Sequence, residues 1–369
     1  MGRFSDMFNG MAKSLSIKKR KTENECVEAL LKDAKRTGKL LRSSGVVNVD
    51  GSQNFASLFS RRGEKGANQD RLVAWEEFGC QEDMMFCGVF DGHGEWGHLV
   101  AKKARDSMPA SLLCRWQDTL AHTSIDSDFD LDSDRKLHAF NVWKQSFIET
   151  CAAVDQELAL QQNFDSCYSG STALSVVRQG DMLIVANIGD SRAVLGSRSE
   201  DGSLVAVQLT VDFKPNITQE AERITRCNGR VFCLEDEPGV YRVWLPHEES
   251  PGLAMSRALG DYCVKGHGLI SVPDVRQWPI SSKDQFVILA TDGVWDVVSN
   301  QEAVEIVSSA PDKAKSARRL ADCAARAWKR TRRGYAADDI SAICLFFHSS
   351  PSSHEAKSQG NSSPHKLAL

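Results

Sequence analysis

The chain has 369 residues, of which 41% are hydrophobic and 25% charged, and its formal net charge is −4. This length allows one large domain or two small ones, and the composition is ordinary for a soluble globular protein. The charge balance gives no sign of a nucleic-acid partner, so we expect none. The longest apolar runs, such as 182–188 and 286–290, are far too short to span a bilayer.

The chain has eleven cysteines, an odd number, and no two of them are spaced as a CxxC pair. No apolar leader follows Met1, so we interpret the cysteines as reduced intracellular thiols rather than a disulfide framework or a zinc cluster. We therefore expect a protein of the cytoplasm, the nucleus or both.

Residues 1–54 are predicted to form a partly disordered N-terminal arm, 55–348 one folded domain, and 349–369 a disordered Ser-rich tail. The arm begins with Met1-Gly2, but Asp6 stands where the myristoylation motif has Ser or Thr. Its basic run, Lys18–Lys21, has three interpretations: peripheral contact with an anionic surface such as the plasma membrane, a nuclear signal, or a solvated charge run. The solvated run is favoured.

The first half of the domain predicts strands at 55–59, 72–75 and 84–90, with a glycine-punctuated polar turn over 61–70. Helices are predicted at 98–113 and 139–161. The segment between them, 117–135, has alternating Asp residues, but it lacks the Gly and the closing Glu of a calcium loop. We interpret it as a solvated acidic loop.

The second half is dense in short strands and turns. Segments 171–177, 182–188, 192–196 and 204–208 predict antiparallel hairpins. A helix at 218–225, a strand at 231–234, an irregular insertion at 235–249 and a compact turn-rich segment at 253–262 follow. Trp244, within the insertion, is interpreted as ordinary packing. A strand at 286–291, helices at about 300–310 and 312–332, and a final strand at 340–347 complete the domain.

Acidic residues stand at the ends of four predicted strands and in the first polar turn. They are Asp70, Asp91, Asp190, Asp292, Asp296, Asp338 and Asp339. Any one alone has an ordinary explanation, because Asp is common in turns and at strand ends. Several buried together would repel one another unless protons or cations lay between them. Carboxylates with no matching thiolates and one well-placed histidine, His93, favour Mg²⁺ or Mn²⁺ over zinc.

Six motifs occur in a fixed order along the domain. They are FDGHG (90–94), GSTA (170–173), NIGDSR (187–192), AMSRALGD (254–261), ATDGVWD (290–296) and DDIS (338–341). This order and spacing resemble the metal-dependent protein phosphatase type 2C family, in the style of its plant members and most closely of their clade E. The resemblance implies an α+β fold, a central antiparallel β-sandwich flanked by α-helices on both faces.

The resemblance also implies a metal site. Asp91 aligns with the carboxylate that bridges two Mg²⁺ or Mn²⁺ ions, and Gly92 with a residue that lends its backbone carbonyl to the first ion. Asp292 and Asp338 align with ligands of the second ion. Asp70 aligns with an acid that ligates or supports the metal pair.

Three further positions follow from the same resemblance. Asp190 and Asp296 match positions near a more loosely held third ion, and His93 matches a proposed general acid. The implied activity is that of a protein serine/threonine phosphatase, in which a metal-activated bridging water attacks the phosphorus of phosphoserine or phosphothreonine. No Arg stands six residues after any Cys, which argues against a thiol phosphatase.

The chain departs from the family pattern near its first motif. Lys65 stands where an Arg often clamps the substrate phosphate, and a Lys loses the bidentate fork. Arg61 or Arg62 is a candidate to compensate. Gln69 replaces an acid, and Asp339 stands in place of Asn. None of these changes touches the principal ligands, so we expect an active enzyme.

Two alternatives remain open at this point. The first is a catalytically weak phosphatase-fold protein that acts as a kinase-binding scaffold, and the second is a small-molecule phosphoesterase with the same metals. For the favoured function, the expected partners are phosphoprotein substrates, such as kinases or signalling proteins. We expect a monomer.

Overall fold

The computed structural model describes residues 55–122, 132–331 and 336–347. The predicted N-terminal arm and Ser-rich tail lie outside the described residues, as does the centre of the predicted acidic loop, 123–131.

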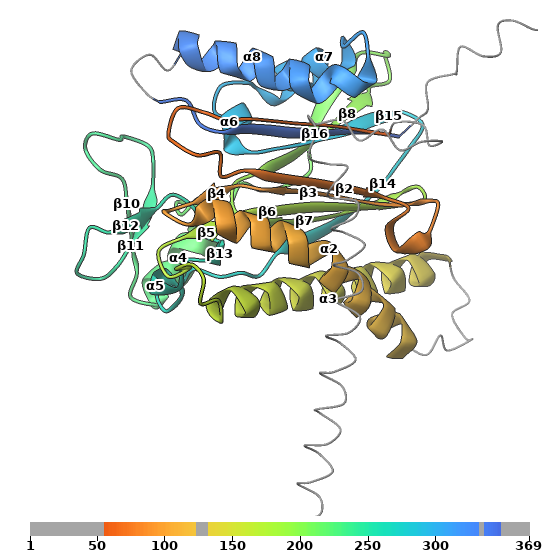
Figure 1. Ribbon diagram of the computed structural model, residues 1–369. Coiled ribbons are helices and arrows are strands. Elements are labelled where there is room, and N and C mark those ends of the chain that lie inside the picture. The colour runs from red at the N-terminus through yellow and green to blue at the C-terminus, as the bar shows by residue number, and fades with distance from the viewer. Residues whose placement is uncertain (1–54, 123–131, 332–335, 348–369) are drawn as a thin grey trace, which may run out of the picture.

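Two five-stranded antiparallel sheets stack face to face (Figure 1). The first has the order β1 (Ala56–Arg61), β16 (Ile340–Phe346), β15 (Asp284–Ala290), β8 (Arg192–Arg198) and β9 (Leu204–Gln208). The second has the order β14 (Asp274–Pro279), β7 (Met182–Ile188), β6 (Ala173–Gln179), β3 (Met84–Phe90) and β2 (Arg71–Glu76). The predicted central sandwich is confirmed.

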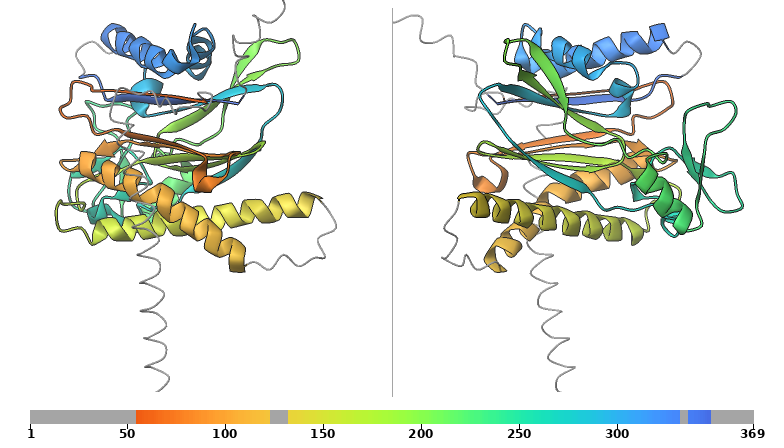
Figure 2. Two further views of the ribbon diagram at one scale, coloured as in Figure 1. Left: turned by 45° about the vertical axis from the view of Figure 1, so that its right-hand side comes forward. Right: turned by 180° about the vertical axis from the view of Figure 1, so that it is seen from behind.

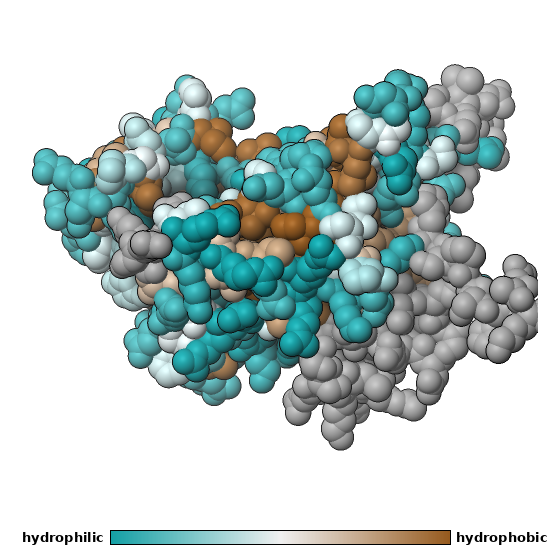
Figure 3. All heavy atoms as spheres, turned by 90° about the horizontal axis from the view of Figure 1, so that it is seen from above, coloured by the Kyte–Doolittle hydropathy of each residue, from teal (hydrophilic) through white to brown (hydrophobic). Residues whose placement is uncertain are grey.

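Helices cover both outer faces of the sandwich, as predicted (Figure 2). The two long helices α2 (Gly97–His122) and α3 (Asp132–Ala159) pack on the second sheet, and α6 (Asp292–Trp295), α7 (Asn300–Ser308) and α8 (Ser316–Thr331) pack on the first. Seen from the side of α7 and α8, the surface is largely hydrophilic, with apolar patches between the polar side chains (Figure 3). The helices therefore bury their apolar faces against the sheets.

Strand β3 shows why the layers form. Its seven residues are all buried, and successive side chains point to opposite faces of the sheet. Met84, Phe86 and Phe90 join the core beneath the helices, whereas Met85 and Val89 join the core between the two sheets. A strand that is covered on both faces is continuously apolar, which is the pattern that made it recognisable in the sequence.

Two small three-stranded sheets lie beside the sandwich. One consists of β10 (Arg230–Phe232), β11 (Arg242–Trp244) and β12 (Pro251–Leu253), and it projects to one side next to α4 (Thr218–Arg226). The other joins β4 (Gly92–His93), β5 (Gly170–Ser171) and β13 (Leu259–Gly260), which leads into α5 (Tyr262–Lys265). Short 3₁₀ turns, η1 (Phe78–Cys80) and η2 (Lys313–Lys315), complete the fold.

Several sequence predictions need correction. The acidic loop predicted over 117–135 is shorter at both ends, because α2 continues to His122 and α3 begins at Asp132. Once a helix is anchored by buried residues such as Trp116, further turns propagate at little cost. The insertion at 235–249 is not wholly irregular, since it contains β11, which pairs with β10 and β12.

The strands also differ in two places. The segments 182–188 and 192–196 do not form a hairpin, because β7 and β8 belong to different sheets. Strand β14 was not predicted, since it is a mixed polar edge strand that ends at Pro279 and has no strong apolar alternation. Trp244 is buried and stacks on Phe232 with ring centroids 5.0 Å apart, as expected of a packing residue.

Candidate active site

The strand register brings together the acidic residues that stand at the ends of the strands. Strand β15 ends beside the start of β16, where Ala290 pairs with Ala342, and β1 ends at the same place, where Arg61 pairs with Ile340. Strand β2 begins beside the end of β3, and only three residues join β7 to β8 across the two sheets. One end of the sandwich therefore collects Asp70, Asp91, Asp190, Asp292, Asp296, Asp338 and Asp339.

These carboxyl groups influence one another electrostatically. Burial raises the pKa of Asp91 well above its usual range, and the charges of Asp70, Asp292, Asp338 and Asp190 raise it further. Burial likewise raises the pKa of Asp292, and its acidic neighbours add to the effect. Such mutual repulsion means that the predicted metal-site acids share one region, and that a cation between them would be strongly attracted.

Asp70 is positioned by the strands beside it. Its Oδ2 accepts a hydrogen bond of 3.0 Å from Thr291 Oγ1, which in turn accepts one of 3.2 Å from the Ser341 backbone N–H. Burial raises the pKa of Asp70 to about 7, although the hydrogen bonds from Ser341 and Thr291 act to lower it. Its Oδ1 is buried and has no hydrogen-bond partner, and the same holds for Asp190 Oδ1.

Buried carboxylate oxygens without partners suit cation ligands, because an unpaired buried oxygen is otherwise costly. Within 55–122, 132–331 and 336–347, no three His, Cys, Asp or Glu side chains are already arranged to hold a metal ion. The fit to Mg²⁺ or Mn²⁺ rests on the orphaned oxygens, the mutually raised pKa values and the all-oxygen donor set.

Gly92 lies where two other backbone segments pass. A Cβ at this position would stand 2.3 Å from the Gly97 carbonyl oxygen and 2.9 Å from that of Gln69, so no larger residue fits without moving backbone. At Gly94 φ is +84°, which favours glycine, and a Cβ there would lie 2.3 Å from the Tyr168 carbonyl oxygen. The two glycines of the FDGHG motif thus allow neighbouring backbone segments to pack closely around the site.

Two lysines reach the acids. Lys65 Nζ lies 2.5 Å from Asp338 Oδ2, although the Lys65 side chain is 58% exposed. Lys214, which sequence reasoning missed, donates a hydrogen bond to Asp190 Oδ2. Burial lowers the pKa of Lys214, but the charges of Asp190, Asp292 and Asp296 outweigh it and raise the pKa. Nothing in the sequence near Lys214 indicates this role, because Asp190 lies on another loop.

The polar turn after β1 is held in place by Asp339. Its two carboxylate oxygens accept hydrogen bonds from the backbone N–H groups of Gly63 and Gln69, both at 2.7 Å. The acid in place of Asn therefore uses both oxygens to fix the loop that presents Lys65. Of the two candidate arginines, Arg61 pairs instead with Asp322 of α8 at 3.1 Å.

Arg62 is exposed, and it makes no hydrogen bond or ion pair with the other described residues. A phosphate in the site would therefore not have to displace an existing partner of this side chain.

His93 has a buried acidic partner that sequence reasoning missed. Its Nε2 lies 2.7 Å from Asp261 Oδ2, and the Asp261 side chain is only 4% exposed. Burial lowers the pKa of His93, but the charge and hydrogen bond of Asp261 and the charge of Asp190 raise it on balance. Asp261 is the last residue of the AMSRALGD motif, and its place in that motif is the sequence signal that could have identified it as a site residue. Its φ of 54° is unusual for a residue other than glycine.

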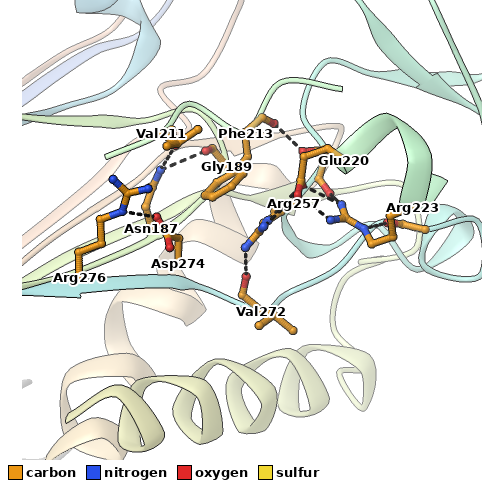
Figure 4. A network of polar contacts seen from close by, with 12 residues as sticks. Asn187, Gly189, Val211, Phe213, Glu220, Arg223, Arg257, Val272, Asp274 and Arg276 are labelled. Atoms are coloured by element: carbon orange, nitrogen blue, oxygen red, sulfur yellow. Dashed lines mark hydrogen bonds and ion pairs between the residues drawn. The ribbon is translucent and has the colours of Figure 1, made fainter. Parts of the chain in front are cut away.

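Other motif residues brace the site rather than enter it. Asn187 Nδ2 donates to the carbonyls of Gly189 and Val211, at 3.2 and 2.9 Å, and so fixes the turn that carries Asp190. Figure 4 shows this contact and, beside it, Glu220 facing both Arg223 and Arg257. The AMSRALGD segment is therefore tied to α4 through Arg257.

Comparison with known proteins places this arrangement in a family. The family model for Protein phosphatase 2C matches residues 59–332. The chain belongs to the protein phosphatase 2C family. It is 62% identical over 360 residues to "Probable protein phosphatase 2C 34" of Arabidopsis thaliana, covering 96% of this chain and 99% of that protein. It is 54% identical over 359 residues to "Probable protein phosphatase 2C 48" of rice, Oryza sativa subsp. japonica, covering 95% and 100%.

Solved structures agree with the fold of a 2C phosphatase. The crystal structure of a serine-threonine phosphatase 2C from Toxoplasma gondii superposes with a TM-score of 0.71 at 26% identity, covering 82% of this chain and 96% of the other. A C. elegans sex determining protein has the same fold at 23% identity, with a TM-score of 0.61 and coverage of 81% and 66%.

The chain is therefore a metal-dependent protein serine/threonine phosphatase, and the predicted fold and enzyme class are confirmed. The family generally binds Mg²⁺ or Mn²⁺, and its substrates are phosphoproteins. Among the described residues, no helix is both long and apolar enough to cross a membrane.

Proposed function

We propose that this 2C phosphatase holds two Mg²⁺ or Mn²⁺ ions between Asp91, Asp292 and Asp338. The Gly92 carbonyl would serve one ion, and Asp70 would ligate or support the pair. Bound ions of this kind supply a water of lowered pKa for in-line attack on phosphorus. The observation that carries the proposal is that burial, together with the charges of neighbouring carboxylates, raises the pKa values of Asp70, Asp91 and Asp292, a cost that bound cations would relieve.

Asp190 and Asp296 would lie at a third, weaker cation site. The Lys214 ammonium group donates a hydrogen bond directly to Asp190 and already offsets part of its charge. A cation at this position would have to share the Asp190 carboxylate with Lys214, whereas no described lysine is hydrogen-bonded to Asp91 or Asp292. This difference is the physical reason to expect looser binding there.

The remaining side chains would handle the phosphate and the leaving group. Lys65, and Arg62 beside it, supply positive charge for the phosphate at the rim of the site. His93, held by Asp261, donates a proton to the serine or threonine oxygen as it leaves, since an alkoxide is a poor leaving group. Such proton donation accelerates reactions by roughly 10²–10⁴-fold.

The test is hydrolysis of a phosphothreonine peptide at millimolar Mn²⁺ or Mg²⁺, with EDTA as the metal-free control. Wild type is expected to turn over and Asp91→Asn to lose that turnover, while Asp236→Asn, at an exposed acid outside the predicted site residues, keeps it. Absence of turnover in wild type would favour the kinase-binding scaffold. Preference for free phosphorylated metabolites over phosphoproteins would favour the small-molecule phosphoesterase.

The finer points of partner and location are part of the same proposal. Kinases or other signalling proteins are the substrates we favour, and we favour a monomer that binds no nucleic acid, in the cytoplasm or nucleus. Peripheral membrane contact would come from the N-terminal arm, and the mass of the mature N-terminus tests whether Gly2 is acylated. The high identity to plant relatives supports placement among the plant members of the family, and a sequence tree tests the proposed clade E assignment.

A further inference from the structure

Two cysteines lie side by side next to the partner of His93. The backbone N–H of Cys263 donates to the carbonyl oxygen of Cys167 at 3.1 Å, and the two thiols are in hydrogen-bond contact. Both are free and half-buried. Cys263 comes two residues after Asp261, and Cys167 lies on the loop that precedes β5.

Their backbone geometry suits a disulfide. A direct backbone hydrogen bond brings two residues close together, and antiparallel residues that exchange two such bonds have their Cα atoms about 5.5 Å apart. A disulfide requires a Cα separation of about 4.4–6.8 Å. Because the two backbones are directly hydrogen-bonded, the bond can form without a large rearrangement of either loop.

We propose that Cys167 and Cys263 form a reversible disulfide when the phosphatase meets a peroxide, and that this bond lowers phosphatase activity. The site is distinct from the metal-binding acids. Its effect on activity rests on the role proposed for His93 and Asp261, whereas formation of the bond does not.

The chemistry takes two steps. The Cys167 thiolate attacks one peroxide oxygen, the O–O bond breaks, and Cys167 becomes a sulfenic acid as hydroxide leaves and takes up a proton. The Cys263 sulfur then attacks the Cys167 sulfur, its proton goes to the departing hydroxyl, and water is released. Two thiols and one hydrogen peroxide thus give one disulfide and two waters, with two electrons passing from sulfur to oxygen.

The order of the steps follows from the surroundings of the two thiols. Burial raises the pKa of Cys263 to about 12, and the nearby Cys167 and Asp261 charges contribute. Cys263 therefore stays protonated, and its S–H can donate to the Cys167 sulfur. The thiolate is the reactive form, so the protonated Cys263 is the resolving thiol, and we assign the first oxidation to its neighbour Cys167.

The bond would act on the site through a short, tightly packed path. The Asp261 backbone N–H donates to the Ser169 carbonyl at 3.1 Å, and Gly170 pairs with His93 between β5 and β4. A Cβ at Gly170 would lie 2.0 Å from Asp261 Oδ2 and 2.7 Å from His93 Nε2, so the backbone of β5 packs directly against both side chains. Forming the disulfide shortens the S–S separation to about 2.05 Å, and this shifts the two loops toward each other. Misplacement by about 1 Å can lower a rate by about 10²-fold.

The experiment treats the full-length, Mn²⁺-loaded protein with hydrogen peroxide, then measures peptide masses and phosphopeptide hydrolysis before and after dithiothreitol. We expect a tryptic cross-link between peptides 145–178 and 258–265, lighter by two hydrogens than the reduced pair. We also expect a loss of activity between about 10- and 100-fold that dithiothreitol reverses. Cys151 shares the first peptide, so Cys167→Ser must abolish the cross-link.

Cys167→Ser and Cys263→Ser should each remove both the cross-link and the reversible loss of activity, and Cys227→Ser, an exposed cysteine elsewhere, should remove neither. No cross-link in wild type would overturn the proposal, as would equal reversible inactivation of the two serine variants. Because the cross-link is read by mass, it can be found even if the catalytic proposal fails. A cross-link with unchanged activity would overturn only the regulatory effect.

Discussion

Two regions of this phosphatase bury acidic side chains, and they treat them in opposite ways. Glu220 of α4 is buried, and Arg223, Arg257 and the Ser256 hydroxyl all donate to it at 2.7–3.1 Å. Burial alone would raise the pKa of Glu220, yet these donors lower it to about 2. At the end of the sandwich, burial and acidic neighbours raise the pKa values of Asp70, Asp91 and Asp292.

The contrast separates an acid that supports structure from acids that are available for function. Glu220 has its counter-charges within the chain, so nothing further is needed to make its burial tolerable. The acids at the sandwich end lack enough counter-charge and hold orphaned oxygens, so a ligand from outside must supply it. Four substitutions test this contrast.

Asp292→Asn is expected to have the largest effect, lowering phosphothreonine hydrolysis by at least about 10²–10³-fold, the scale of removing one transition-state stabiliser. Metal-free stability should not fall, because one buried repulsion is removed. In wild type, Mn²⁺ at 100 times its dissociation constant should add about 2.7 kcal/mol of stability, and the variant should lose most of this gain. Activity assays and thermal melts with and without Mn²⁺ measure both, and a metal-free melting temperature several degrees lower would contradict the interpretation.

Glu220→Gln should have the opposite effect, a loss of about 3 kcal/mol in unfolding free energy, because it leaves two partly buried guanidinium groups without a counter-charge. Since the folded pKa of Glu220 is depressed, its contribution is present above the unfolded value of 4.5 and is lost as pH falls toward about 2. The gap between wild type and variant should therefore narrow over this range in denaturant titrations. Glu222→Gln, exposed on the same helix, is the matched control and should stay within about 0.5 kcal/mol of wild type at pH 7.

Asp261→Asn should lower hydrolysis of a phosphothreonine peptide by about 10²-fold, because His93 loses the charge that holds its proton. The loss should be much smaller with p-nitrophenyl phosphate, whose leaving group departs without protonation. A double variant with His93→Gln should be no slower than the slower single variant if the two residues act as a unit. Equal losses on both substrates would assign Asp261 a purely structural role.

Lys65→Met should have the smallest effect, about a tenfold loss in kcat/KM, since Lys65 is a largely exposed point charge that pairs with Asp338. Lys65→Arg should lower KM a few-fold through bidentate phosphate contacts. Arg61→Met is the comparison, and because Arg61 pairs with Asp322 on α8 it should leave KM unchanged. Steady-state kinetics on one phosphopeptide measures all three, and a large kcat effect for Lys65→Met would imply that Lys65 acts on the metal site.

Most of the architecture was predictable because its signals are local. The strands β3 and β16 are buried on both faces, so each is a run of consecutive apolar or small residues that can be recognised in the sequence. The acids at strand ends were recognisable for the same reason, and family resemblance supplied their roles. Strand β14 escaped prediction, because an edge strand with polar residues lacks that local pattern.

The sequence by itself determined most of the strands and helices, the family, and which acids are candidates to bind metal. Only the tertiary structure decided which partner each charge meets: Asp261 for His93, Lys214 for Asp190, Asp339 for the backbone of the Lys65 loop, and Cys263 for Cys167. The reason is that electrostatic and hydrogen-bond energies depend on distance in space. These partners lie 24 to 276 residues apart along the chain, where no local pattern can connect them.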